Sequence, residues 1–308
     1  MLVGDGGPAT AALFASPTDV VQDESGDLYI VDSSLAVVRK VDNKTGIITT
    51  IAGNNSVVSV NKKVSGDGGP ANRAQFHTPT GLALWQGCLY VADQFGGTVR
   101  RINLTTNIVT TVAGNATLGQ GFAGDGGPAT RAQVSATAVA IDPRNGNMLL
   151  ADYQFPRIRR VSASTGIITT IAGNGTLGTG LNRDWGMGGF ANQTAIFVPR
   201  GITVDPAGNV YFACDIGSVV QKVDTAGRVS IVTGKLTNTS WTGDKGPAGQ
   251  CLSQYGMCFG GQGGGGIAGG LGRLLRLRQN PLHAQRASQH VAYTLWHSPN
   301  DFSMTSLM

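Results

Sequence analysis

Four aspartates end the same kind of apolar run in successive parts of the sequence, and their type and spacing could serve a metal site. Carboxylates at one level of a symmetric fold are ligands for a divalent cation. An aspartate that ends a strand also accepts hydrogen bonds from the backbone N–H groups of the next turn. We favour this structural role, because a repeat spreads such acids one per unit, and we therefore expect no metal and no cofactor. The four residues are Asp32, Asp93, Asp152 and Asp215.

A second set of aspartates lies in the glycine-rich segment GDGGPA. Glycine-flanked backbone can bind an anion, and the aspartate could join a calcium site. The D-x-D-x-D-G spacing of a calcium-binding loop is absent, however. We expect a tight turn with positive φ whose Pro-Ala pair packs on the neighbouring unit. The segments are Gly4–Ala9, Gly66–Ala71, Gly124–Ala129, the altered copies Gly186–Ala191 and Gly243–Ala248, and their aspartates are Asp5, Asp67, Asp125 and Asp244.

These segments mark a repeat, because their starts are separated by 57 to 62 residues. A period of this size indicates one supersecondary unit used several times. The 308 residues include 46 glycines and only 13% charged residues, which is typical of β proteins with tight turns. Four short apolar runs follow one another in each unit, and the first begins with a proline except in the third unit, where we place Thr137 at that position.

The second run of each unit is apolar on both faces, although the unit has no helix to cover it. Stacking four-stranded antiparallel sheets against one another covers both faces, which is the arrangement of a β-propeller. The sequence therefore predicts an all-β propeller with four complete blades and the opening of a fifth. The expected blades are residues 16–53, 78–114, 136–173 and 198–234.

The order of motifs resembles the NHL-repeat β-propeller family. GDGGPA is followed by P-x-G, then by a run such as Cys88-Leu-Tyr-Val-Ala-Asp93, then V-R-K-V-D, and finally G-I-I-T-T-I-A-G-N. The resemblance is to the subgroup with GDGGPA inserts between blades, found in extracellular and bacterial surface proteins. It covers residues 1–250. Since propellers of this family most often have six blades, the resemblance implies a partial propeller.

Catalysis in a propeller needs His, Glu or metal ligands that converge at the axis. Residues 1–250 contain one histidine, His77, which we interpret as an exposed turn residue. The E-G-P-x-W stretch of gluconolactonase-like propellers is absent. A non-enzymatic interaction module that binds a protein or a glycan is therefore the function we favour. The alternative is a divergent metal-dependent hydrolase or lactonase.

Basic pairs recur in the third run of three units. Such pairs could form a basic face for RNA. Neighbouring residues of a strand point to opposite faces, so half of these side chains at most share one surface. We expect solvated or blade-bridging charges and no nucleic-acid partner. The pairs are Arg39-Lys40, Arg100-Arg101 and Arg159-Arg160.

N-x-S/T sequons in predicted turns favour passage through the secretory pathway and an extracellular or cell-surface location. No run of 18 apolar residues is present to span a membrane. Met1 is followed at once by repeat residues without a signal peptide, so we expect the natural N-terminus to lie further upstream. The sequons begin at Asn43, Asn54, Asn103, Asn115, Asn174, Asn192 and Asn238.

The long segments between blades carry the residues we expect to bind a partner. Trp185 and Trp241 lie in such segments, and aromatic residues often anchor interfaces. Residues 251–308 depart from the repeat, and we expect a glycine-rich linker and a basic, disordered tail. Cys251 and Cys258 are close enough in sequence to pair, whereas Cys88 and Cys214 lie two repeats apart. The oligomeric state stays open.

Overall fold

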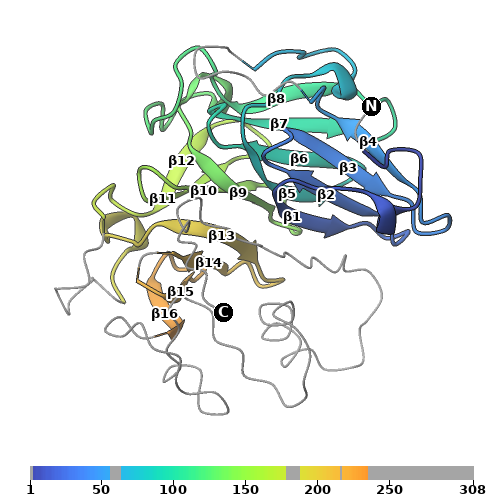
Figure 1. Ribbon diagram of the computed structural model, residues 1–308. Helices are drawn as coiled ribbons and strands as arrows, with labels where there is room; N and C mark the ends of the chain where they lie inside the picture. The colour runs from blue at the N-terminus through green and yellow to red at the C-terminus, as the bar shows by residue number, and fades with distance from the viewer. Residues whose placement is uncertain (1–2, 56–63, 178–187, 216, 235–308) are drawn as a thin grey trace, which may run out of the picture.

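The computed structural model describes residues 3–55, 64–177, 188–215 and 217–234. These residues form four antiparallel four-stranded sheets, each built from consecutive strands in chain order (Figure 1). This confirms the predicted all-β fold with four propeller blades. The strands of blades 1 and 2 are β1 (Pro17–Gln22), β2 (Leu28–Asp32), β3 (Val37–Val41), β4 (Ile48–Ala52), β5 (Pro79–Trp85), β6 (Cys88–Asp93), β7 (Thr98–Asn103) and β8 (Val109–Gly114).

Blades 3 and 4 repeat the same order of strands. A short 3-10 helix precedes each blade, directly after the proline or phenylalanine of the GDGGPA-type segment. The strands are β9 (Ala136–Ile141), β10 (Met148–Asp152), β11 (Arg157–Val161), β12 (Ile168–Ala172), β13 (Pro199–Val204), β14 (Val210–Cys214), β15 (Val219–Val223) and β16 (Val229–Gly234), and the 3-10 helices are η1 (Ala9–Ala11), η2 (Ala71–Arg73), η3 (Ala129–Arg131) and η4 (Ala191–Gln193).

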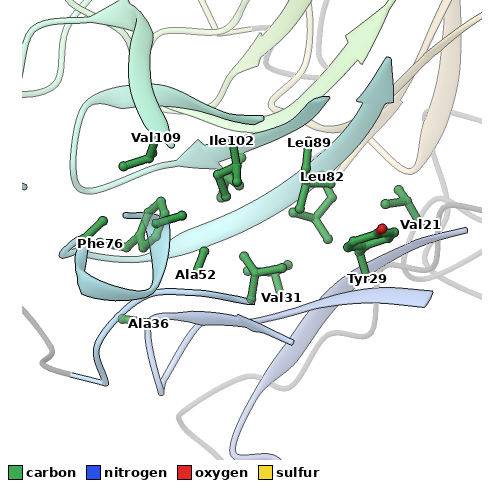
Figure 2. Packing of buried hydrophobic residues seen from close by; sticks show 14 residues of the cluster. Val21, Tyr29, Val31, Ala36, Ala52, Phe76, Leu82, Leu89, Ile102 and Val109 are labelled. Carbon is green, nitrogen blue, oxygen red and sulfur yellow. The ribbon is translucent and has the colours of Figure 1, made fainter. Parts of the chain in front are cut away.

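The blades are held together by apolar cores between neighbouring sheets. Figure 2 shows the core between blades 1 and 2, where Tyr29 and Val31 of β2 face Leu82 and Leu89 of the next blade. Corresponding clusters join blade 2 to blade 3 and blade 3 to blade 4. The central strand β10 is buried along its whole length, as expected for a strand that is covered on both faces.

The first strand of each blade is the innermost one. β1 packs against β5, β5 against β9, and β9 against β13, whereas the described residues show no comparable packing between β13 and β1. Hydroxyl groups link these inner strands across blades: Thr80 Oγ1 donates to Thr137 O at 2.8 Å, and Thr137 Oγ1 donates to Pro199 O at 3.2 Å. The described part of the chain is thus a run of four consecutive propeller blades.

The strand register corrects one expectation for blade 3. Pro17 lies opposite Asp32, Pro79 lies opposite Asp93, and the residue opposite Asp152 is Ala136. Ala136 therefore takes the place of the proline, and Thr137 is the next residue along the strand. The one-residue error arose because both residues are small and neither carries the fixed φ of proline.

Candidate functional site

The aspartates that end the second strands are buried anchors for the chain entering each blade. Asp93 is fully buried and accepts the backbone N–H groups of Thr78 at 2.7 Å and His77 at 2.9 Å. Asp32 accepts the N–H groups of Ala15 and Ser16 in the same way. The donors therefore precede the first strand of the blade, whereas we had expected donors in the next turn. Only Asp32 adds one from that turn, Leu35 N–H at 3.1 Å.

Burial raises the pKa of two of these aspartates. Desolvation raises the pKa of Asp152 to about 6, although Arg159 and the Ser135 N–H lower it in part. Desolvation also raises the pKa of Asp93 against the opposing effect of the His77 and Thr78 N–H groups. Both carboxylates thus lie in a water-poor interior, where backbone donors and an arginine stabilise their charged form.

Asp215 does not occupy the corresponding position in blade 4, which corrects our alignment. The register places Cys214 opposite Pro199, so the cysteine takes the place of the strand-end aspartate. Asp215 is the next residue and forms a partly exposed ion pair with Arg200, with an N–O distance of 2.9 Å. The aspartate that directly follows Cys214 misled the alignment, although the residue six positions after the turn glycine Gly208 is Cys214.

An arginine buried in the third strand holds the aspartate of each intact GDGGPA segment. In blade 3, Arg159 Nη2 lies 2.6 Å from Asp125 Oδ1, and Arg159 Nη1 donates to Gln133 O. Arg39–Asp5 and Arg100–Asp67 repeat this pair at 2.7 Å. The three arginine side chains are at most 1% exposed, whereas their neighbours in sequence point outward: Lys40 is half-buried, and Arg101 and Arg160 are exposed.

The GDGGPA segment itself closes the outer edge of its blade. Gly126 N–H donates to Ile168 O of β12, and Ala129 N–H donates to Gly166 O, both at 2.8 Å. The first glycine has positive φ, and a Cβ on Gly124 would lie 2.7 Å from the Cα of Ala132, so only glycine fits. Since unpaired outer strands invite aggregation, these bonds protect an otherwise open edge.

The segment also joins neighbouring blades. Gly53 N–H at the end of blade 1 donates to Ala71 O of the next segment at 2.9 Å, and Gly173 N–H bonds Ala191 O in the same way. The alanine of the Pro-Ala pair therefore packs on the preceding blade, whereas Pro70 forms a bridge with Ile108 of its own blade. The aspartates of the GDGGPA segments therefore stabilise the fold, with arginine side chains and backbone N–H groups as their partners.

Three exposed apolar side chains belong to the segment between blades 2 and 3 and to the β6–β7 turn, against which this segment lies. Leu118 is 54% exposed, Phe95 48% and Phe122 46%. Phe95 belongs to the β6–β7 turn, and Phe122 packs against Phe155 of the β10–β11 turn with ring centroids 5.1 Å apart and ring planes tilted by 53°. The guanidinium of Arg157 lies 4.2 Å from the centre of the Phe122 ring. We call Phe95, Leu118 and Phe122 the apolar patch.

The segment that carries the apolar patch is fixed by side-chain hydrogen bonds. Gln120 Nε2 donates to Gln94 O and Ser135 Oγ, both at 3.1 Å. Gln133 Nε2 donates to Leu118 O at 3.0 Å. The backbone of Gly119 lies directly against Gly97 of the β6–β7 turn, where a Cβ on Gly97 would lie 3.0 Å from the carbonyl carbon of Gly119. Leu118 and Phe122 are therefore exposed by an ordered backbone.

The inner strands carry a single acid in the described part of the chain. Asp19 of β1 accepts the N–H of Leu82 in the next blade at 2.7 Å and the N–H of Val20 at 2.8 Å. Desolvation raises its pKa to about 7. The corresponding residues of the other blades are Gly81, Ala138 and Gly201. No three His, Cys, Asp or Glu side chains of the described residues gather as a metal site.

The structure also places the histidine, the cysteines and the sequon asparagines that the sequence singled out. His77, which we interpreted as an exposed turn residue, is instead half-buried, with Nδ1 2.8 Å from Thr78 Oγ1 and its ring 5.8 Å from that of Phe95. Cys88 and Cys214 are free thiols. Asn43, Asn54, Asn174 and Asn192 are exposed, and Asn103 and Asn115 are half-buried. The residues outside the described part include Trp185, Trp241, Asp244, Asn238, Cys251, Cys258 and the whole of 251–308.

Comparison with known proteins identifies sequences that are similar to this chain. A family profile described as the Teneurin NHL domain matches residues 2–65. Teneurin-1 of Mus musculus is 27% identical over 230 residues, which cover 70% of this chain and 8% of the relative. NHL repeat-containing protein 2 of Gallus gallus is 34% identical over 114 residues, covering 37% of this chain and 14% of the relative. The chain thus spans less than a tenth of the length of Teneurin-1.

A solved structure shows a distant likeness to this chain. A nidogen/laminin complex contains a chain that matches with a TM-score of 0.46 and 14% identity, covering 69% of this chain and 64% of that one. No helix in the described residues is both long enough and apolar enough to cross a membrane. Together, the repeated blade motifs, the four sheets and the NHL-containing relatives support an NHL-repeat propeller family for this chain.

Proposed function

We propose that this propeller is a non-enzymatic interaction module that binds a protein partner through the apolar patch. The observation that carries the proposal is the ordered exposure of Leu118 and Phe122. Burial of apolar surface against a partner would stabilise the complex by about 25 cal/mol of free energy for each Å² removed from water. A segment that is fixed in place loses little conformational entropy when a partner binds it.

The chemistry of the patch favours a protein over a glycan. Leu118 is aliphatic, and the exposed face combines it with two phenylalanines, which lack polar groups for sugar hydroxyls. Arg157 beside Phe122 adds one charge at the border. Buried aromatic anchors with a polar or arginine rim are typical of protein interfaces. The extracellular or cell-surface setting, which the sequons favour, is part of the proposal. Trp185 and Trp241 remain further candidate anchors.

The rival function is that of a metal-dependent hydrolase or lactonase at the axis. Asp19 is the residue that such a mechanism would use first, because its pKa near neutrality suits proton transfer. Its two oxygens already accept backbone N–H groups of Val20 and Leu82. Turnover of a lactone or ester panel with calcium or zinc that is abolished by Asp19→Asn would favour the rival.

The binding proposal is tested with the full chain immobilised for surface plasmon resonance. A panel of purified extracellular and cell-surface ectodomains is passed over wild type, over Leu118→Ala/Phe122→Ala, and over Leu13→Ala. Leu13 is 64% exposed and belongs to the insert before blade 1, so it serves as the matched control. We expect the double variant to weaken a protein ligand by at least about tenfold, or ~1.4 kcal/mol, with unchanged melting temperature.

Two results would contradict the proposal. One is a ligand whose affinity falls equally in Leu13→Ala, because the apolar patch would then have no special part in binding. The other is binding that is confined to a glycan array, which would identify a carbohydrate ligand in place of a protein.

A further inference from the structure

Asn115 lies at the border of the apolar patch and begins the sequon Asn115-Ala116-Thr117. It directly follows β8, which ends at Gly114. The carbonyl oxygen of Asn115 accepts the N–H of Leu118 at 2.9 Å and that of Gly119 at 3.2 Å. The asparagine is therefore within one turn of the exposed leucine, on the backbone that the glutamines hold in place.

The side chain of Asn115 is arranged with its amide nitrogen available. Its Oδ1 accepts the N–H of Thr117 at 2.9 Å. Its Nδ2 has no hydrogen-bond partner within the described residues, and it is not among their buried polar atoms. By contrast, Nδ2 of Asn43 donates to Ser25 O at 3.1 Å, and Nδ2 of Asn174 donates to Gln193 O at 3.3 Å. An N-linked sugar on Asn115 would break no bond of the described fold.

Asn103 offers a comparison on the other side of the blade. Its Oδ1 accepts the N–H of Thr105 at 3.0 Å, so its sequon has a similar local geometry. It is the last residue of β7, at the opposite end of the sheet from the β6–β7 turn that carries Phe95. A glycan on Asn103 would therefore leave the apolar patch uncovered.

We propose that Asn115 is an N-glycosylation site whose glycan covers Leu118 and the adjoining patch, so that glycosylation controls access of a partner. The effect on partner binding rests on the proposed function. The glycosylation of Asn115 and the covering of Leu118 by its glycan do not depend on that function. In the transfer, Nδ2 attacks the anomeric carbon of a lipid-linked oligosaccharide pyrophosphate. The carbon–oxygen bond to pyrophosphate breaks, the lipid pyrophosphate leaves, and Nδ2 loses one proton and keeps the other.

The test expresses the full chain with an added secretion signal in cultured mammalian cells. Thr117→Ala removes the sequon but keeps the backbone N–H that Asn115 Oδ1 accepts, and Thr117→Ser retains the sequon. Thr105→Ala removes the comparison sequon at Asn103. Glycopeptide mass spectrometry measures occupancy at each asparagine. Hydroxyl-radical footprinting then measures the oxidation rates of Leu118 and Phe122, with the exposed Phe190 as the internal reference.

We expect occupied Asn115 in wild type, in Thr117→Ser and in Thr105→Ala. Oxidation of Leu118 and Phe122 should be several-fold slower in these proteins than in Thr117→Ala, whereas the rate at Phe190 stays constant. An unoccupied Asn115, or equal oxidation with and without its glycan, would overturn the inference. The footprinting experiment uses no partner protein. If the glycan covers the patch but the chain binds no ectodomain, the proposed function is refuted and this inference stands.

Discussion

Arg159 and Asp125 are 34 residues apart in sequence, yet Arg159 Nη2 and Asp125 Oδ1 lie 2.6 Å apart at the outer edge of blade 3. Asp125 Oδ2 also accepts the N–H of Thr170 in the outer strand β12. The pair therefore ties the insert before the blade to both its third and its fourth strand. Arg159 is fully buried, and Asp125 is 40% exposed, so the charge that most needs a partner is the guanidinium.

The sequence of blade 4 lacks both the buried arginine and the aspartate of this pair. Gln221 occupies the buried arginine position, and the sequence has Met187 where the aspartate of GDGGPA would stand. Cys214 replaces the strand-end aspartate, and its Sγ lies 3.4 Å from Gln221 Oε1. A neutral set has thus replaced the charged set, as expected if a lone buried arginine would be unfavourable.

The first prediction transfers the residues of blade 4 to blade 3. Asp125→Met leaves the buried Arg159 with only the more distant carboxylate of Asp152, 3.6 Å away, and should cost about 2–3 kcal/mol of unfolding free energy, less than the loss of a fully buried partner because Asp125 is partly exposed. Arg159→Gln should also destabilise. The double variant should lose clearly less than the sum of the two, as measured by urea unfolding in a double-mutant cycle. Additive losses would show that the two side chains act independently.

Much of the blade could be predicted from the sequence, because its signals are local. The turn glycines and the apolar runs identify sixteen strands, and stacking is required by the apolar faces of runs such as Met148–Asp152. The Arg–Asp pairs were missed, although their spacing of 33 or 34 residues and their joint loss at Met187 and Gln221 were a signal in the sequence. Aspartate in a glycine-rich turn has a sufficient local explanation, so nothing suggested a distant partner.

The apolar patch could not be predicted from the sequence for a different reason. Leu118 and Phe122 lie on an irregular segment that runs beside the β6–β7 turn of Phe95, and the course of this segment depends on hydrogen bonds from Gln120 and Gln133. Such bonds have no periodic signature. The register at Cys214, by contrast, had a signal in the sequence. Asp32, Asp93 and Asp152 each lie six residues after the glycine of the preceding turn, and the residue six positions after Gly208 is Cys214, not Asp215.

The second prediction concerns Asp93 as an anchor. Asp93→Ala removes the acceptor for the N–H groups of His77 and Thr78 in a fully buried position. An unsatisfied buried donor costs about 1–3 kcal/mol, so a loss within or above that range is expected by urea unfolding. Asp93→Asn keeps an acceptor oxygen and should lose less. Equal losses in the two variants would indicate that packing, and not hydrogen bonding, is what Asp93 contributes.

The third prediction compares two glycines that share a backbone conformation. Gly114 has φ of 85° and Gly126 has φ of 81°. A Cβ on Gly114 would collide with Gly97 O, whereas a Cβ on Gly126 would meet nothing within 4 Å. Gly126→Ala should therefore cost only the left-handed backbone term of about 1–2 kcal/mol. Gly114→Ala should cost distinctly more in thermal unfolding, because the backbone must also move. Similar melting temperatures for the two variants would contradict this close approach.

The fourth prediction is a pH dependence that comes from Asp19. Burial raises its pKa from 3.8 to about 7, so the folded chain holds a proton that the unfolded chain has already released. The contribution of Asp19 to the stability of wild type should then be highest below about pH 4, fall as the pH rises toward about 7, and level off above that value. Asp19→Asn retains an acceptor for the Leu82 N–H but cannot ionise. The unfolding free energy of the variant minus that of wild type should therefore grow between these pH values, as followed by urea titrations at each pH. A difference that stays constant across this range would show that Asp19 does not lose its proton on unfolding, and that the inner contact between blades 1 and 2 is insensitive to pH.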